Sequence, residues 1–197
     1  SVEGLHHVPT TGPVIVASNH LSFFDSVVIP VVVPRKVVFL AKSDYFTGTG
    51  VKGALSRAWF EGLGMLPVDR DDTKAAIASL DTALEVLRRG EAFGIYPEGT
   101  RSRDGRLYRG RTGVAWLALT SGATVIPVAL TGTENIQPPG SKRLRLARVT
   151  VEFGASVPAA GSAASGQDRR NVTYDTMATI HRLRVREFSG AYTVQPA

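Results

Sequence analysis

Residues 14–25 read VIVASNHLSFFD, an apolar run that gives way abruptly to polar residues. The first four residues follow Gly12 and Pro13, which favour a turn, and a short continuous run of mostly β-branched residues predicts a buried strand. A strand that is apolar on both faces is typical of a parallel sheet covered by helices on both sides. We therefore expect the polar residues after it to lie at the carboxyl edge of such a sheet, where α/β proteins bind their ligands.

Further apolar runs alternate with helical patterns along the rest of the chain. The predicted strands are residues 14–17, 36–41, 65–68, 92–96, 124–130 and 149–153, and the predicted helices are residues 73–89, 112–121 and about 168–188. This alternation predicts an α/β fold with a mostly parallel sheet of about six or seven strands flanked by helices. A chain of 197 residues is expected to form a single domain over residues 1–197, with residues 155–167 as a flexible connection inside it.

The composition argues against several classes of protein. Apolar residues make up 43% of the chain and charged residues 20%, as in soluble globular domains and unlike disordered chains. The longest apolar stretch, residues 27–33, contains Pro30 and falls well short of the roughly 20 residues that a spanning helix needs. The first residues lack the pattern of a signal peptide. The chain has no cysteine, which excludes disulfides, thiolate metal sites and a cysteine nucleophile, and no metal site is expected.

The charge is unevenly distributed along the chain. Residues 1–99 carry 9 Lys and Arg against 11 Asp and Glu, which gives −2, whereas residues 100–197 carry 14 against 6, which gives +8; together these make the net charge of +6. A basic half of this kind indicates an anionic partner, such as phosphate groups, an acidic lipid surface or nucleic acid, unless it is an ordinary solvated face.

His20 and Asp25 follow the first predicted strand. Ser22 is expected to be the N-cap of a helix, and Asp25, three positions later, fits the reciprocal half of a capping box. That structural role needs no histidine, however, and the spacing also allows the carboxylate to reach the imidazole of His20. An imidazole held by a carboxylate keeps one tautomer and accepts a proton from a hydroxyl through its other nitrogen. The pair is therefore a candidate general base.

Phosphate-binding side chains are predicted at three other strand ends. Residues 96–105 read YPEGTRSRDG, in which glycine allows a ligand to approach the backbone while Thr100 and Arg101 supply donors suited to phosphate. Arg70 follows the third predicted strand, and Lys42 follows the second. Because the carboxyl ends of parallel strands meet at one edge of a sheet, we expect these groups to lie near the His–Asp pair.

These residues also resemble the motifs of a known family. His20 and Asp25 resemble the H-x4-D motif of the glycerolipid acyltransferases, which include the 1-acylglycerol-3-phosphate acyltransferases, and residues 97–101 match the P-E-G-T-R block of that family. Residues 64–70 resemble its G-x-x-F-x-x-R block, with proline in place of the aromatic residue, and residues 125–128 resemble its V-I-P-V block. The four blocks occur in the family's order.

The resemblance implies a fold of the glycerol-phosphate acyltransferase type, a reaction and a set of site residues. In the family the histidine is the base and the aspartate orients it, so that the acceptor hydroxyl attacks the thioester of acyl-CoA or acyl carrier protein without an acyl-enzyme and without a further cofactor. The implied acceptor is a lysophosphatidic acid, which gives phosphatidic acid in phospholipid synthesis, with glycerol 3-phosphate or another lysolipid as alternatives. The acceptor would be bound by Arg70, Glu98, Gly99, Thr100 and Arg101, with Lys42 at the same edge, and the acyl side would be lined by Val125, Ile126 and Pro127.

The resemblance implies contact with a membrane as well. Family members carry a membrane-associating segment ahead of the first strand, and only about a dozen residues precede that strand here, so we expect the segment to be missing or truncated. The expected location is the cytoplasmic face of the cell membrane, with peripheral contact to anionic lipid. Phe23, Phe24 and residues 27–33 are candidates for the apolar contact, unless they belong to the core.

The sequence also suggests two other functions, a nucleotide-binding oxidoreductase and a non-catalytic binding protein. Residues 48–53 read GTGVKG and match the fingerprint of nucleotide-binding oxidoreductases, but that fingerprint requires a first glycine directly after a strand. Seven residues separate Gly48 from Leu40, at the end of the predicted strand. A non-catalytic binder of nucleic acid would need aromatic residues between its arginines as a stacking platform, and only Tyr108 stands among them. We therefore expect no nucleic-acid partner.

Overall fold

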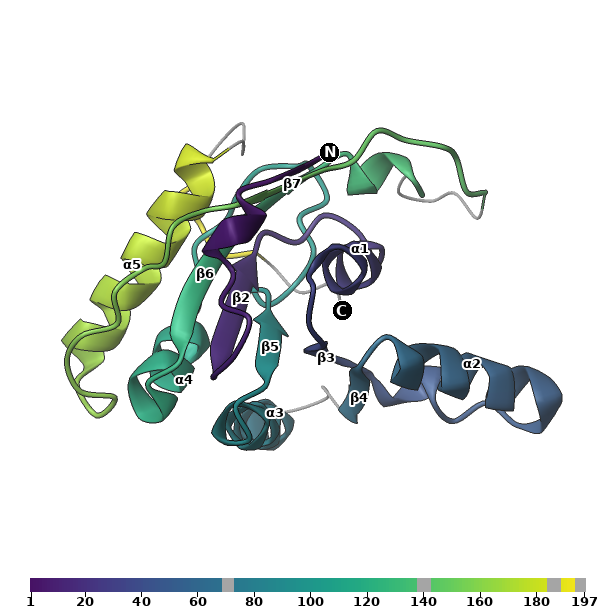
Figure 1. Ribbon diagram of the computed structural model, residues 1–197, viewed down its shortest axis with the longest axis horizontal. Helices are drawn as coiled ribbons and strands as arrows, with labels where there is room; N and C mark the ends of the chain where they lie inside the picture. The colour runs from purple at the N-terminus through teal and green to yellow at the C-terminus, as the bar shows by residue number, and fades with distance from the viewer. Residues whose placement is uncertain (69–72, 138–142, 184–188, 194–197) are drawn as a thin grey trace.

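A computed structural model describes residues 1–68, 73–137, 143–183 and 189–193. The strands that it describes form a seven-stranded sheet in the order β1-β7-β6-β2-β5-β3-β4 (Figure 1). Neighbouring strands are parallel except β6 and β7, which are antiparallel. The strands are β1 (Val2–Glu3), β2 (Val14–Ser18), β3 (Val37–Lys42), β4 (Met65–Val68), β5 (Ala92–Ile95), β6 (Thr124–Thr131) and β7 (Thr150–Phe153). The predicted mostly parallel α/β sheet is confirmed.

Five α-helices lie in the described ranges. They are α1 (Asp25–Val32), α2 (Gly50–Gly62), α3 (Thr73–Arg88), α4 (Gly113–Ser121) and α5 (Gly166–Arg182), and short 3₁₀ turns cover η1 (Leu5–His7), η2 (Ser43–Tyr45) and η3 (Thr133–Asn135). The hydroxyl of Ser165 accepts the N–H of Asp168 and caps α5, while α4 ends at Gly122, whose φ of 69° suits glycine. The three predicted helices are present, although the predicted end of the last one falls partly on residues 184–188, outside the description.

The helices cover both faces of the sheet, as the continuous apolar strands predict. All five residues of β2 are buried, and they alternate between two apolar clusters. One cluster packs Val14 and Val16 against Ile29 of α1, and the other packs Ile15 and Ala17 against α3 and α4. Helix α5 packs its buried Met177 and Ile180 beside β6 (Figure 1). Because β2 lies at the centre of the sheet, its carboxyl end holds the residues that follow it in a fixed position.

The sheet opens between β3 and β5. These two strands pair only at their first residues, Val37 with Ala92 and Val38 with Phe93, and from Phe39 onward β3 pairs with β4 on its opposite edge. The ring of Phe39 lies in the opening against Gly94: a Cβ added to that glycine would come within 2.1 Å of the ring. Glycine at position 94 therefore leaves room for the ring of Phe39 beside β5.

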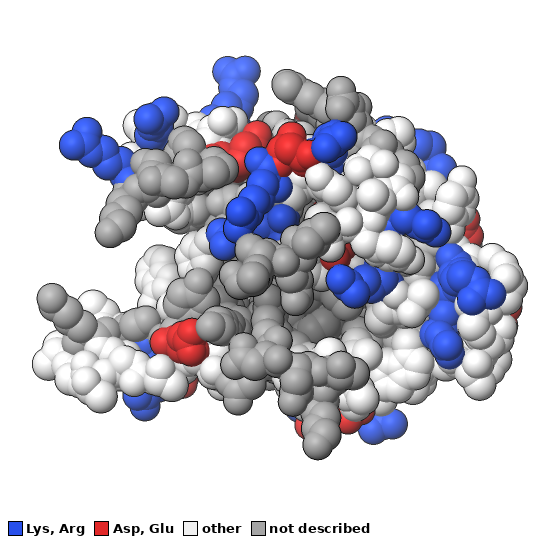
Figure 2. Space-filling view, turned by 180° about the vertical axis from the view of Figure 1, so that it is seen from behind, with Lys and Arg blue, Asp and Glu red and all other residues white. Residues whose placement is uncertain are grey.

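Two parts of the chain project from the same side of the molecule in Figure 1. One is α2, and the other is the segment of residues 143–149 that leads into β7. Seen from behind, the surface is hollowed between them (Figure 2). Within the described residues, no helix is long and apolar enough to cross a membrane.

Candidate active site

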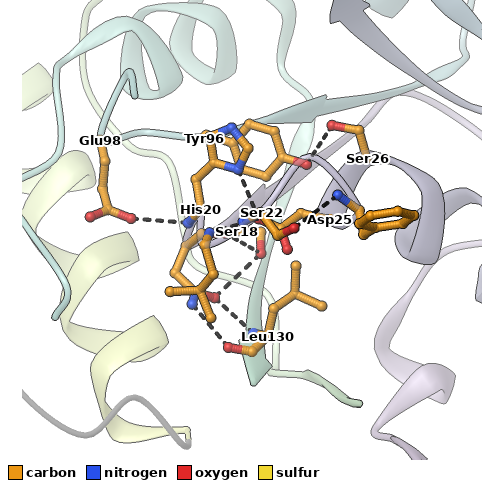
Figure 3. A network of polar contacts seen from close by, with 11 residues as sticks. Ser18, His20, Ser22, Asp25, Ser26, Tyr96, Glu98 and Leu130 are labelled. Atoms are coloured by element: carbon orange, nitrogen blue, oxygen red, sulfur yellow. Dashed lines mark hydrogen bonds and ion pairs between the residues drawn. The ribbon is translucent and has the colours of Figure 1, made fainter. Parts of the chain in front are cut away.

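His20 and Asp25 touch at the carboxyl end of β2. The Nδ1 atom of His20 lies 2.8 Å from Oδ2 of Asp25, whose side chain is completely buried, while the imidazole keeps 13% of its surface exposed. The same carboxylate oxygen accepts the backbone N–H groups of Leu21 at 2.7 Å and Ser22 at 2.8 Å (Figure 3). Three donors thus fix this carboxylate. With Nδ1–H donating to Asp25, the Nε2 atom of His20 is left as the proton acceptor.

The expected helix cap at Ser22 is wrong. Helix α1 begins three residues later, at Asp25, and the hydroxyl of Ser22 accepts the N–H of Phe24 inside the preceding turn. The reciprocal half of the capping box is nevertheless present, because the side chain of Asp25 accepts the N–H of Ser22. The carboxylate of Asp25 accepts hydrogen bonds from the side chain of His20 and from the backbone N–H groups of Leu21 and Ser22. These bonds stabilise a turn before the helix starts. A capping interaction and an imidazole partner are therefore both supplied by Asp25.

Tyr96, at the end of the neighbouring strand, supports the imidazole from its face. The two rings are stacked, with centroids 3.8 Å apart and an angle of 6° between the planes (Figure 3). The hydroxyl of Tyr96 makes a 2.7 Å hydrogen bond with that of Ser26 on α1. This residue was missed by the sequence analysis, since its role depends on β5 lying next to β2. Carboxylate and tyrosine together leave the imidazole little freedom to rotate.

Glu98, which was predicted to bind the acceptor, is buried. Only 1% of its surface is exposed. One carboxylate oxygen accepts the backbone N–H of His20 at 3.1 Å, and the other accepts that of Tyr108 at 2.8 Å. The carbonyl oxygen of His20 in turn accepts the N–H of Ser102 at 2.7 Å. The loop of residues 98–102 therefore holds both backbone groups of His20, and the geometry makes Glu98 a positioning residue, because a buried carboxylate repels phosphate.

The environment of Glu98 also changes its protonation. Burial raises the pKa of its carboxyl group from 4.5 to about 7, opposed by the N–H groups of Tyr108 and His20, while the negative charge of Asp25 adds a smaller upward contribution. A carboxylate that titrates near neutral pH next to the backbone of a candidate base is a feature typical of functional sites.

The other predicted phosphate-binding residues divide into two groups. Gly99, Thr100 and Arg101 lie on the loop beside His20; Gly99 and Arg101 are exposed and Thr100 is half-buried. Gly99 has a φ of 82°, and a Cβ there would come within 2.8 Å of Nε of Arg111, so glycine allows this arginine to lie against the loop. The other two are Arg70, which lies outside the described residues, and Lys42, the last residue of β3. The side chain of Lys42 is not among the described parts of the structure.

A cavity of about 720 Å³ runs from His20 into the opening between β3 and β5. Gly99 and Arg111 lie at the end that His20 lines, and the remaining walls are largely apolar. These walls include Leu40, Val68, Leu80, Phe93, Ile95 and Val114, from β3, β4, β5, α3 and α4. The volume is within the roughly 300–1,000 Å³ usual for ligand pockets. The site thus joins a candidate base, an exposed guanidinium and an apolar chamber.

The three residues predicted for the acyl side do not line this cavity. Val125, Ile126 and Pro127 are buried in β6, which lies on the other side of β2 from the opening. Their apolar character reflects a central strand covered on both faces. The walls of the chamber come instead from residues that only the divergence of β3 and β5 brings together.

The nucleotide fingerprint does not have the context that it requires. Gly48 is separated from β3 by η2, and the later glycines of the motif, Gly50 and Gly53, lie in the first turn of α2. Gly53 packs directly on the backbone of Gly48, where a Cβ would come within 1.9 Å of its carbonyl oxygen. These glycines therefore serve close packing of the chain. Among the described residues, no group of three or more potential metal ligands gathers.

The family model for the acyltransferases matches residues 1–131. The chain is 32% identical over 143 residues to a chloroplastic 1-acyl-sn-glycerol-3-phosphate acyltransferase of Arabidopsis thaliana, with 72% of this chain and 38% of that protein covered. It is 31% identical over 134 residues to the 1-acyl-sn-glycerol-3-phosphate acyltransferase of Borreliella burgdorferi, with coverage of 68% and 52%. The matches thus span about two fifths to one half of these relatives' length.

The fold is also similar to a solved structure. The crystal structure of the 1-acyl-sn-glycerophosphate acyltransferase PlsC from Thermotoga maritima superposes with a TM-score of 0.71 at 26% sequence identity, over 94% of this chain and 72% of that one. The similarity therefore extends beyond the stretch of residues 1–131 that the family model matches.

Proposed function

The chain belongs to the acyltransferase family, and from this premise we propose that it transfers a fatty acyl group from a thioester donor to the free hydroxyl of a lysophosphatidic acid, which gives phosphatidic acid. The observation that carries the proposal is the His20–Asp25 pair beside a cavity of about 720 Å³ whose walls between β3 and β5 carry apolar side chains. A base beside such a chamber suits a reaction in which a hydroxyl and an acyl chain must meet. The names of the relatives support the acceptor.

The arrangement of the His20–Asp25 pair supports a general-base reaction. Nε2 of His20 accepts the proton of the acceptor hydroxyl as its oxygen attacks the thioester carbonyl, while Asp25 stabilises the imidazolium that forms. The new C–O bond forms and the C–S bond breaks, and the imidazolium returns the proton to the departing thiolate. The acceptor oxygen is itself the nucleophile, so no acyl-enzyme is needed. General-base catalysis of this kind contributes roughly 10²–10⁴ in rate.

The two ends of the site bind the two kinds of substrate group. The acyl chain occupies the chamber between β3 and β5, where Leu40, Leu80 and Ile95 offer apolar contact. The acceptor's phosphate meets Arg101, Thr100 and the N–H groups of their loop, together with Arg111 at the cavity. Positioning matters here because a displacement of about 1 Å can cost 10²-fold in rate.

The donor, the partners and the location are part of the proposal. The donor is acyl-CoA or acyl carrier protein, used as a co-substrate without any further cofactor. The acceptor is a membrane lipid, so the protein works in peripheral contact with an anionic membrane at the cytoplasmic face of the cell membrane. Glycerol 3-phosphate or another lysolipid is the alternative acceptor.

A direct assay tests this function. The chain is incubated with palmitoyl- or oleoyl-CoA and, in parallel, with lysophosphatidic acid, glycerol 3-phosphate and a dephosphorylated monoacylglycerol, and the release of free thiol is followed. We expect turnover with lysophosphatidic acid that is lost in His20→Ala, whose fold is checked by circular dichroism. Turnover that persists in this variant, or a preference for the acceptor without phosphate, would refute the proposal.

A further inference from the structure

An arginine-rich segment with exposed leucines leads into β7. Residues 143–148 read RLRLAR, and their three arginines are all exposed. Leu144 keeps 64% of its surface in contact with solvent, and Leu146 is fully exposed. Large apolar side chains exposed among cations on a projecting segment indicate a surface that contacts something both apolar and anionic. The interior of the protein makes no use of these two leucines.

Helix α2 presents a second apolar stripe at the same side of the molecule. Val51, Leu55 and Trp59 are four residues apart and therefore share one face of the helix, and all three are more than half exposed. Figure 1 shows α2 projecting from the sheet on the side where residues 143–149 also project, and Figure 2 shows basic side chains on the upper of the two projections, across the hollow from α2.

The inner face of α2 is connected to the catalytic loop. Phe60 is buried, and its ring lies edge-on to that of Phe23, with centroids 5.9 Å apart. Phe23 follows His20 by three residues, so the helix that carries the exposed stripe packs directly against the turn that carries the base. Phe23, one of the predicted membrane-contact residues near the base, thus packs inside the fold, and the exposed stripe of α2 ends at Trp59, one residue before Phe60.

We propose that residues 143–148 and the outer stripe of α2 dock this protein on the surface of an anionic lipid bilayer. The proposal rests on the proposed function, since it names the surface through which an enzyme of lipid substrates meets them. Leucines enter the interfacial layer while the neighbouring arginines meet anionic headgroups, and Trp59 is of the residue type that prefers the interface. Each leucine that leaves water strengthens binding about tenfold, and each arginine near the headgroups about fivefold.

A bilayer fits this surface better than the other anionic partners do. An acidic carrier protein would pair with the arginines but would leave the exposed leucines and a separate apolar helix face without a role. A nucleic acid would need aromatic rings between the cations for stacking, and residues 143–148 contain none. Apolar residues in two separate projections suit an extended, fluid surface.

The test compares vesicle binding by variants of the whole chain. Co-sedimentation is measured with vesicles of phosphatidylcholine alone and with vesicles that also contain phosphatidylserine. The apolar variants are Leu144→Ser/Leu146→Ser and Leu55→Ser/Trp59→Ser, and the charge variant is Arg143→Gln/Arg145→Gln/Arg148→Gln. Control variants remove exposed residues elsewhere: Ile77→Ser/Tyr174→Ser for the apolar changes and Arg88→Gln/Arg170→Gln/Arg182→Gln for the charge.

The expected result is a loss of about 100-fold in binding to the mixed vesicles for each apolar variant and for the charge variant, with the preference for phosphatidylserine lost in the charge variant. The controls should bind as the unchanged protein does. Equal binding by variants and controls would overturn the proposal, as would an unchanged protein that binds no vesicles, or variants that lose affinity for acyl carrier protein instead of vesicles.

Activity separates this proposal from the proposed function. With a short-chain, water-soluble acceptor the variants should retain normal turnover, whereas with an acceptor embedded in mixed vesicles they should lose it in proportion to binding. Loss on the soluble acceptor as well would overturn docking as the role of this surface. An unchanged protein that binds the vesicles but acylates neither acceptor would refute the proposed function and leave the docking surface supported.

Discussion

Glu98→Gln removes a buried charge while keeping the size of the side chain. In the folded protein the two carboxylate oxygens accept the N–H groups of His20 and Tyr108. Glutamine has one oxygen and one NH₂ group, so it can accept only one of these N–H groups and must turn a donor toward the other. The substitution therefore tests both the protonation of Glu98 and its hold on the backbone of His20.

The magnitude follows from the pKa of this carboxyl group. Burial raises it from 4.5 to about 7, so the folded protein binds the proton more tightly than the unfolded chain does. The stability that this gives is fully present below pH 4.5 and is lost as the pH rises through 7. Across the whole range the loss is about 3 kcal/mol, of which about 2.5 kcal/mol falls between pH 5 and pH 8.

The assay is urea unfolding of both proteins at a series of pH values from 5 to 8. Other groups that titrate in this range, including the histidines, are common to both proteins and cancel in the comparison. The difference in free energy of unfolding between the variant and the original protein should therefore change by about 2.5 kcal/mol across the series, in favour of the variant at pH 8. If the free energies of unfolding of the two proteins change in parallel with pH, Glu98 does not titrate between pH 5 and pH 8. That result would refute the argument that burial raises its pKa.

Kinetics of the same variant separate positioning from substrate binding. If Glu98 holds the backbone of His20, Glu98→Gln should lower kcat by roughly 10–100-fold with little change in the KM for the acceptor. A raised KM with unchanged kcat would instead place Glu98 in contact with the acceptor. Glu98→Asp, which keeps the charge but cannot reach both donors equally well, should recover part of the activity and part of the pH dependence.

Further predictions concern the base, the phosphate, the chamber and the stacked ring. His20→Ala should lower kcat by roughly 10²–10⁴ while the thermal transition stays near that of the original protein, as measured by calorimetry. Arg101→Ala should raise KM for lysophosphatidic acid far more than for monoacylglycerol, and equal effects on both would contradict a phosphate contact. Gly94→Ala should force the ring of Phe39 out of its place, with a loss of about 1–3 kcal/mol in urea unfolding and a shift in donor preference toward shorter acyl chains. Tyr96→Phe should lose the hydrogen bond to Ser26, at a cost of about 1 kcal/mol, and retain most activity; a loss of activity as large as that of His20→Ala would show that the hydroxyl acts in the reaction.

Much of the fold could be predicted because its signals are local. The apolar runs of β2 and β6 are continuous, since both strands are buried on both faces, and such runs are visible without any knowledge of neighbours. Strand β1 was not predicted because two residues carry no pattern. Helix α2 was missed because its glycines favour a loop and its apolar stripe faces outward, where it adds nothing to the core pattern.

The site was predictable to the same extent. The five-residue spacing between His20 and Asp25 brings the two together within one turn, so it could be inferred from sequence order alone. Glu98 was assigned to the acceptor because a carboxylate on a glycine-rich loop gives no sign of its burial. Tyr96 and Arg111 were missed because their positions depend on which strands are neighbours.

The sequence by itself determined the family, the parallel α/β architecture and the His–Asp pair. These features depend on residues that are close together in the chain, such as a continuous apolar run or a spacing of five residues. Only the tertiary structure decided the chamber, the placement of Glu98 and the location of the exposed apolar surfaces. The chamber lies between β3 and β5, whose paired residues Val37 and Ala92 are more than fifty positions apart in the chain. Burial and exposure of this kind arise from the packing of distant segments, and no local pattern encodes them.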